Sequence, residues 1–126
     1  MKVLTLKQPW ATLVSEGYKK YEFRTWKTNF RGELYIHAGK GIDKEGMERV
    51  KSLNLDYPKG KIIAKVTITD CIKLNSEINK KINKENSMIY GNNENREGYA
   101  WKIEKVEKIN LNKAIKGKLG LWNYEK

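Results

Sequence analysis

The sequence predicts a single domain over residues 1–126 of the mixed α+β class, predominantly β. In this fold five or so strands form a closed or nearly closed β-barrel with helices on its rim. Three observations predict it. The length of 126 residues suits one domain that buries its own core. Several segments alternate apolar and polar residues with the period of a strand, and no repeat or linker divides the chain.

The first three elements are a short strand, a short helix and a second strand. Residues 2–6 predict the first strand, and Pro9 follows at a position where a helix tolerates its missing N–H. Apolar residues then recur with helical spacing over residues 10–14, and Gly17 ends this helix. Aromatic residues that alternate with charged ones predict the second strand at residues 20–26.

A hairpin and a helix are expected next. Residues 29–32 predict the turn of a β-hairpin that joins the strand 20–26 to a third strand at residues 33–38. Residues 43–54 predict a helix with an apolar stripe, although Gly46 lowers the helix propensity of this segment.

The two clearest strands lie in the second half of the chain. Residues 61–74 place most of their apolar residues on one parity and lysines and threonines on the other. Residues 99–109 predict another long strand, with a β-bulge where the apolar parity shifts between Ile103 and Val106. The end of the chain, residues 116–126, returns as a short apolar segment interrupted by glycines.

An asparagine-rich stretch separates these two strands. Residues 75–95 contain seven asparagines, which favour turns and loops. A helix is predicted at residues 76–84, and we expect a mobile loop within the rest of the stretch.

The net charge points to an anionic partner. The chain carries 26 Lys and Arg against 15 Asp and Glu, a formal net charge of +11, which attracts polyanions such as nucleic acids. The chain is also rich in Lys, Asn and Ile, as products of AT-rich genomes are, so composition alone leaves the partner open. Most of the excess positive charge lies at the two ends of the chain. Residues 1–40 carry 8 basic and 3 acidic side chains, and residues 98–126 carry 7 basic and 3 acidic side chains.

Composition also argues against several classes of protein. A single cysteine, Cys71, and a single histidine, His37, exclude an internal disulfide framework and argue against a zinc site. No apolar run approaches the roughly 18 residues of a membrane span, and no signal peptide begins the chain. We therefore expect a cytoplasmic protein with no membrane association, no metal and no cofactor, and a monomer as the default state.

One face of the strand 20–26 carries the strongest indication of a site. Glu22, Arg24 and Trp26 share one parity of this strand, and Lys19 lies at its entrance. The face is either a solvated surface with a weak ion pair or the wall of a cleft beside the first helix. In a cleft, the carboxylate, guanidinium and ammonium would offer an acceptor and donors to a base edge or a phosphate.

Tryptophan and histidine add further candidates. Trp10 at the helix start and Trp26 on the charged parity could each stack on a base, whereas Trp101 is expected in the core. His37, the only imidazole, is either a hydrogen-bonding histidine of the fold or a ligand-binding group that titrates near neutrality. Cys71 is expected to be a small core residue.

Both ends of the chain resemble the ASCH (activating signal cointegrator homology) domain of the PUA-like superfamily. Residues 6–40 contain its Gln-Pro-Trp-Ala start, an Arg-Gly turn and an Ile-His-Ala strand end. Residues 98–109 and 115–123 are similar to its final strand and its closing Gly-Lys-x-x-Gly-x-Trp segment. The family's Gly-x-Lys-x-x-Glu-x-Arg pattern falls on Gly17, Lys19, Glu22 and Arg24.

The resemblance implies a five- or six-stranded β-barrel with a cleft beneath the first helix, lined by this pattern. It also implies a link to RNA or DNA binding, which is reported for the family and its PUA relatives. One branch of the family removes acyl groups from N4-acylated cytidines with a lysine, a threonine and a more distant glutamate. Lys19 matches that lysine, but Glu22 stands where the branch has its threonine.

Three functions remain open. The first is a nucleic-acid-binding module, for RNA rather than DNA, whose cleft holds one unstacked nucleotide. The second is a small hydrolase, acting on a modified nucleoside of the N4-acylated cytidine type or on an RNA phosphodiester, with Lys19 and Glu22 as catalytic acid and base. The third is a protein-interaction domain. The residues expected to contact nucleic acid are Trp10, Lys19, Glu22, Arg24, Trp26, Lys27, Arg31, His37, Lys116 and Lys118.

Overall fold

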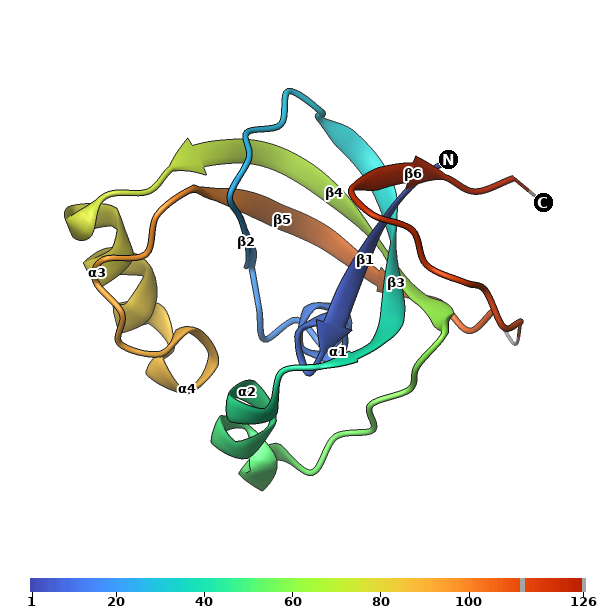
Figure 1. Ribbon diagram of the computed structural model, residues 1–126, viewed down its shortest axis with the longest axis horizontal. Coiled ribbons are helices and arrows are strands. Elements are labelled where there is room, and N and C mark those ends of the chain that lie inside the picture. The colour runs from blue at the N-terminus through green and yellow to red at the C-terminus, as the bar shows by residue number, and fades with distance from the viewer. Residues whose placement is uncertain (112, 126) are drawn as a thin grey trace.

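The computed structural model describes residues 1–111 and 113–125. Six strands form one sheet in the order β2-β5-β4-β3-β1-β6 (Figure 1). Strands β1 and β3 pair in parallel, and all other neighbours pair antiparallel. The strands are β1 (Lys2–Gln8), β2 (Tyr21–Arg24), β3 (Gly32–Ile42), β4 (Lys61–Lys73), β5 (Tyr99–Lys108) and β6 (Leu121–Asn123).

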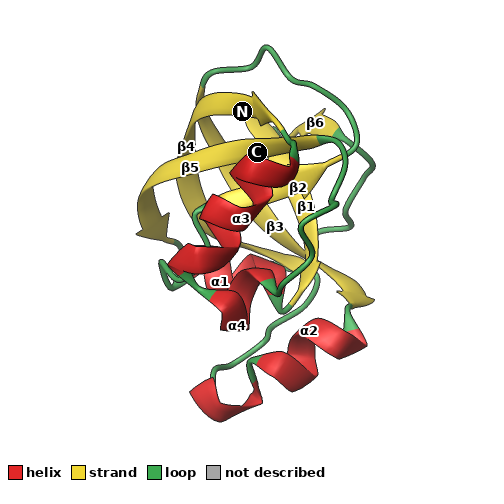
Figure 2. Cartoon of the chain, turned by 90° about the vertical axis from the view of Figure 1, so that its left-hand side faces the viewer, coloured by secondary structure: helices red, strands yellow, loops and turns green. Residues whose placement is uncertain are grey.

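Four short α-helices and one 3-10 turn complete the fold. They are α1 (Trp10–Ser15), α2 (Lys44–Arg49), the 3-10 turn (Lys51–Leu53), α3 (Ser76–Glu85) and α4 (Ser87–Tyr90). Helix α1 contacts strands β1, β3, β4 and β5, and it is buried from its second residue to its last. Helix α4 contacts both α2 and α3 and lies between them below the sheet (Figure 1, Figure 2).

The fold is mixed α+β and mostly β, as predicted, but closure of the sheet into a barrel is not confirmed. The sheet curves strongly (Figure 1), yet β2 and β6 are its two edges, and within residues 1–111 and 113–125 no pairing joins them. Both edge strands are short, with four residues in β2 and three in β6.

The expected hairpin between residues 20–26 and 33–38 is wrong. Strand β2 pairs with β5, so that Glu22 lies opposite Trp101, while β3 pairs with β1 and β4. Residues 25–31 carry the chain from one part of the sheet to another instead of reversing it. Phe30 of this connection packs against the main core, which gives the crossing segment an apolar anchor.

Several other expectations are confirmed. The strand predicted at 61–74 is β4, and its neighbour β5 contains the predicted bulge, where Lys105 adopts a left-handed φ of 52°. The helix predicted at 76–84 is α3, and α4 follows it directly. The asparagine-rich stretch is therefore mostly helical, and two of its asparagines cap these helices. Asn75 accepts from the N–H of Ile78, and Asn86 accepts from that of Ile89.

Two apolar clusters hold the helices in place. The main core lies between the curved sheet and α1 and includes Leu4, Leu34 and Trp101. A second cluster, with Leu13 and Ile89 among its buried members, joins α1 to α2, α3 and α4. This second cluster positions the helices around the candidate site described next.

No helix in the described part of the chain is both long enough and apolar enough to cross a membrane.

Candidate functional site

A cavity of about 260 Å³ lies where helices α1, α2 and α4 approach strand β2. We refer to it as the Lys19 pocket. Its walls combine aromatic rings with charged groups from segments that are far apart in the sequence. The lining residues are Trp10, Lys19, Glu22, Phe23, Asp43, Arg49, Ile89, Tyr90 and Arg96.

The end of α1 directs Lys19 into this pocket. Gly17 has a φ of +83°, a left-handed conformation that glycine adopts without steric cost, and it turns the chain out of the helix. The backbone N–H of Lys19 then donates to the Leu13 carbonyl at 3.0 Å. As a result the Lys19 side chain points inward and is 3% exposed.

Lys19 and Glu22 form a buried ion pair. The Lys19 Nζ donates to Glu22 Oε1 at 3.3 Å and also to the Tyr21 carbonyl. Burial lowers the pKa of Lys19, and the Glu22 carboxylate opposes that shift only in part. Arg96 and Arg24 lower it further, because their charges have the same sign.

Aromatic rings surround the Lys19 ammonium. Its Nζ lies 4.7 Å from the centroid of the Phe23 ring and 5.7 Å from the centroids of Trp10 and Tyr90. The Tyr90 hydroxyl accepts from the backbone N–H of Lys20 at 2.7 Å. Burial raises the pKa of Tyr90 to about 12, so this phenol is neutral at physiological pH.

Trp10 has its position because residue 46 is a glycine. A Cβ at Gly46 would lie 2.6 Å from Trp10 Cζ2 and 2.7 Å from Cη2, which is closer than two carbon atoms can approach. Asp43 caps α2 by accepting from the N–H of Gly46 at 2.9 Å. The Arg49 guanidinium of the same helix lies 5.6 Å from the Trp10 ring centroid.

Arg24 stands behind the pocket and not in its wall. Its Nε lies 3.2 Å from Glu22 Oε2, and its Nη2 donates to the Thr5 carbonyl at 3.0 Å. Glu22 therefore lies between two cations, Lys19 and Arg24. The predicted cluster of three charges does form, but only Lys19 and Glu22 of the three line the cavity.

The family model for the ASCH domain matches residues 4–116. The chain belongs to the ASCH domain family. It is 32% identical to Activating signal cointegrator 1 of Mus musculus and 35% identical to Activating signal cointegrator 1 of Homo sapiens. Each alignment covers 55% of this chain and 14% of the relative, so the chain spans a small part of the length of these two proteins.

Sequence reasoning did not identify several groups in the pocket of this ASCH domain. Arg49, Tyr90 and Arg96 come from α2, α4 and the loop before β5, and all three line the cavity. Asn79 and Asn83, whose side chains accept hydrogen bonds from the Arg96 guanidinium, lie in the helix predicted at residues 76–84, but no role in a site was predicted for them. Their spacing of four residues within the predicted helix 76–84 places them on one helix face and was the available signal.

Three predicted contact residues lie outside the pocket of the ASCH domain. Trp26 is 38% exposed and packs edge to face on Trp101, with 4.7 Å between ring centroids. Lys27 is exposed. Arg31 donates to the carbonyls of Thr28 and Phe30 and lies 3.9 Å from Asp70.

The predicted residues His37, Lys116 and Lys118 line a second cavity of about 810 Å³, which we call the His37 cavity. His37 is buried, with Nδ1 at 3.2 Å from Thr5 Oγ1 and Nε2 at 2.6 Å from the Ile115 carbonyl. Both ring nitrogens therefore have protein partners, as the hydrogen-bonding alternative for His37 expects. Lys40, Lys59, Lys116 and Lys118 also line this cavity.

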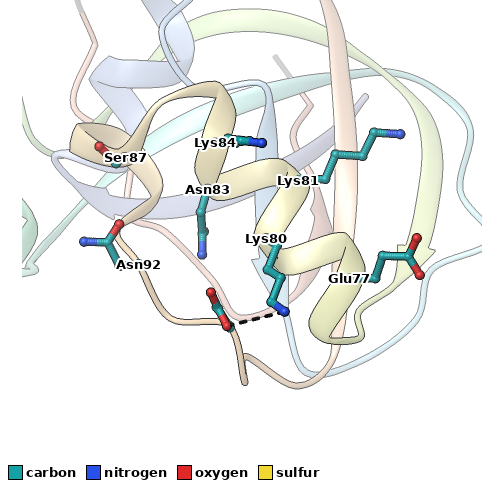
Figure 3. A pocket seen from close by; sticks show the side chains of 8 residues that line it. Glu77, Lys80, Lys81, Asn83, Lys84, Ser87 and Asn92 are labelled. Carbon is teal, nitrogen blue, oxygen red and sulfur yellow. Dashed lines mark ion pairs between the residues drawn. The ribbon is translucent and has the colours of Figure 1, made fainter.

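A third hollow of about 800 Å³ follows the outer side of α3 (Figure 3). Its lining residues are all of polar or charged types, and an ion pair of 3.9 Å joins Lys80 to Glu94 across it. None of the residues predicted from the sequence lies there. Asn83 connects it to the Lys19 pocket, because the Asn83 side chain bonds to Arg96.

Proposed function

We propose that this ASCH domain binds single-stranded RNA and that the Lys19 pocket accepts one unstacked nucleotide. The observation that carries the proposal is the composition of the pocket wall, where aromatic rings and cations converge around a buried carboxylate. Trp10 offers apolar ring surface to a base. The Glu22 carboxylate offers an acceptor for an exocyclic amino group.

Charge outside the pocket supports a polynucleotide over a free nucleoside. The net charge of +11 favours association with a phosphate backbone. Lys27, Arg31, Lys116 and Lys118 are the exposed or partly exposed cations that we propose as phosphate contacts. The preference for RNA over DNA, and a location in the cytoplasm, rest on the resemblance to PUA-like proteins and on composition.

The two tryptophans provide a matched test. Fluorescently labelled single-stranded RNA is titrated against the wild type, Trp10→Leu and Trp26→Leu at several salt concentrations. Trp10 lines the pocket and Trp26 does not, so Trp10→Leu should weaken binding about tenfold while Trp26→Leu binds as the wild type does. Circular dichroism confirms that each variant is folded. Equal affinity of all three proteins, or absence of binding by the wild type, would refute the proposal.

A second candidate function is hydrolysis of a modified nucleoside or of RNA. The observation that favours it is the buried Lys19–Glu22 pair, since burial lowers the pKa of Lys19 and so makes its proton easier to transfer beside a carboxylate. Residue 22 is a glutamate and provides no hydroxyl nucleophile, so water would have to attack the substrate directly.

The test is incubation with N4-acetylcytidine and with single-stranded RNA, followed by chromatography of the products. A hydrolase of this kind should release acetate or shortened RNA with the wild type and lose at least about a hundredfold in rate in Glu22→Gln. Turnover that survives this substitution would remove Lys19 and Glu22 from the mechanism. No turnover with either substrate leaves the binding function as the sole proposal.

A further inference from the structure

We infer that the Lys19 pocket contains an anion subsite at Arg96, which binds a phosphate or carboxylate group of the ligand. The inference deepens the proposed function and rests on it for the source of the anion, namely the phosphate of the nucleotide in the pocket.

Among residues 1–111 and 113–125, the Arg96 guanidinium bonds only to neutral oxygens. Its Nη1 donates to Asn79 Oδ1 at 2.8 Å, and its Nη2 donates to Asn83 Oδ1 at 3.2 Å and to the Tyr90 carbonyl at 2.8 Å. An arginine side chain has five N–H groups, so these three bonds leave two for a ligand.

Arg96 also lacks a counter-charge. Arg24, Arg31 and Arg49 each have a carboxylate within 4.0 Å, at Glu22, Asp70 and Glu45. Within residues 1–111 and 113–125, Arg96 is the one arginine without such a neighbour. A partly buried cation with no anion beside it is costly to maintain, and an anionic ligand would remove that cost.

The direction in which the pKa of Arg96 is shifted agrees with this geometry. Burial lowers the pKa of Arg96, the nearby charge of Arg49 lowers it further, and only Tyr90, once ionised, raises it. No carboxylate contributes. By contrast, the positive charge of Lys19 is compensated by Glu22 and that of Arg49 by Glu45.

The guanidinium is fixed in place before any ligand arrives. Its central carbon lies 3.9 Å from the centroid of the Phe23 ring. Asn79, which is fully buried, donates to the carbonyls of Arg96 and Glu94, and Asn83 donates to that of Asn93. Two asparagines of α3 thus hold both the loop and the guanidinium, an arrangement that lowers the entropic cost of binding.

A role for Arg96 in loop packing alone does not explain its charge. The three oxygens that it contacts are neutral, so they do not compensate a cation. A guanidinium that faces a cavity, lies against an aromatic ring and has free N–H groups is the arrangement that proteins use to bind phosphate and carboxylate.

Calorimetric titration distinguishes binding of the anionic group from binding of the base. The probes are cytidine 5′-monophosphate, cytidine, inorganic phosphate and acetate, and the proteins are the wild type, Arg96→Gln and Lys80→Gln. Lys80→Gln removes one positive charge from α3 at a site outside the pocket and so serves as the matched control. The wild type and Lys80→Gln should bind the nucleotide about tenfold more tightly than the nucleoside. In Arg96→Gln this preference should disappear while affinity for cytidine stays the same.

The four probes distinguish the two hypotheses. Equal affinity for nucleotide and nucleoside in the wild type overturns the anion subsite and leaves the base-binding pocket intact. Binding of phosphate or acetate that depends on Arg96, without binding of nucleotide, nucleoside or labelled RNA, supports the anion subsite and overturns the proposed function. A carboxylate source is indicated if acetate binds and phosphate does not. Absence of binding by all probes overturns both.

Arg96→Gln could also unfold the loop before β5, which circular dichroism and thermal melting would reveal. Arg96→Lys then takes its place, because lysine keeps the charge but lacks the planar group that fits both asparagines. It should retain part of the preference for the nucleotide. If Arg96→Lys prefers the nucleotide over the nucleoside as strongly as the wild type does, also at high salt, then a cation other than Arg96 binds the anion. This result would overturn the inference.

Discussion

The Lys19 pocket and the His37 cavity accommodate positive charge in opposite ways. In the pocket the cations are buried or half-buried, and carboxylates such as Glu22 lie among them. In the cavity four lysines face solvent with no carboxylate in the lining, and the buried group, His37, bonds only to neutral oxygens. Lys19 and Arg49 of the pocket each have a carboxylate beside them, and Arg96 is the exception among the described residues, whereas the surface lysines of the cavity are available to a polyanion.

The largest expected effect is the loss of the buried carboxylate at Glu22. Glu22→Gln leaves Lys19 and Arg24 without their shared counter-charge, so the free energy of unfolding should fall by about 3 kcal/mol. Denaturant titration measures this change. Glu33→Gln is the matched control, because Glu33 is 60% exposed and its ion pair with Lys65 lies at the surface.

Removing the buried cation as well should partly reverse this loss. In the Glu22→Gln background, Lys19→Met replaces a charge that lacks a partner by an apolar side chain and should restore more than 1 kcal/mol. If Glu22→Gln and Glu33→Gln destabilise equally, the contrast between buried and exposed charge drawn above is wrong.

Alanine substitutions at two glycines with positive φ test how closely the chain packs near the Lys19 pocket and near the His37 cavity. Gly98, which precedes β5 beside the pocket, has a φ of +98°, and a Cβ there would lie 2.5 Å from the Arg24 carbonyl oxygen. Gly120, beyond the loop of the His37 cavity, has a φ of +63° and no atom within 4 Å of a Cβ. Gly98→Ala should therefore cost about 3 kcal/mol and Gly120→Ala about 1 kcal/mol. Equal melting temperatures of the two variants would contradict the close packing at Gly98.

Tyr90 gives the pocket a dependence on alkaline pH. Its folded pKa of about 12 lies above the ordinary 10, so the folded state binds the phenolic proton more tightly than the unfolded state does. This stabilisation, about 1–2 kcal/mol, is complete below pH 10 and is lost as the pH rises toward 12.

Comparison of the wild type with Tyr90→Phe separates the contribution of Tyr90 to the free energy of unfolding from the titration of other groups. Near pH 8 the variant should be about 1 kcal/mol less stable, because the hydrogen bond from the Lys20 N–H is lost. The difference should shrink as the pH approaches 12, since phenylalanine does not ionise. A difference that stays constant from pH 8 to 12 would show that Tyr90 is not protected from solvent.

The smallest effect on stability is expected in the His37 cavity. Lys116→Glu combined with Lys118→Glu should leave the melting temperature within about 1 °C of the wild type, because both lysines are exposed. If they contact phosphates, the slope of log affinity for single-stranded RNA against log salt should fall by roughly 1 to 2. An unchanged slope would remove both lysines from the proposed phosphate contacts.

Local patterns in the sequence predicted the parts of the molecule that local physics determines. The alternation over residues 61–74, the bulge between Ile103 and Val106 and the proximity of Lys19 to Glu22 all follow from the backbone period of short segments. The family pattern added the functional interpretation of Lys19 and Glu22.

Contacts between distant segments were not predictable in the same way. The hairpin was expected because residues 20–26 and 33–38 are neighbours in the chain, yet β2 pairs with β5, whose first residue is Tyr99. Arg96 reaches the pocket through Asn79 and Asn83, whose residue type favours loops in isolation. Their burial on one face of α3 depends on packing that no short segment determines alone.

The contact between Gly46 and Trp10 gives a way to compare this chain with other members of its family. Any side chain at position 46 would displace the indole ring and so change the width of the pocket, although residue 46 does not line it. The size of this one residue is therefore a marker of pocket shape that can be read from sequence. In a chain that keeps Trp10, a larger residue at position 46 requires the indole ring or helix α2 to shift, and the width of the pocket then changes.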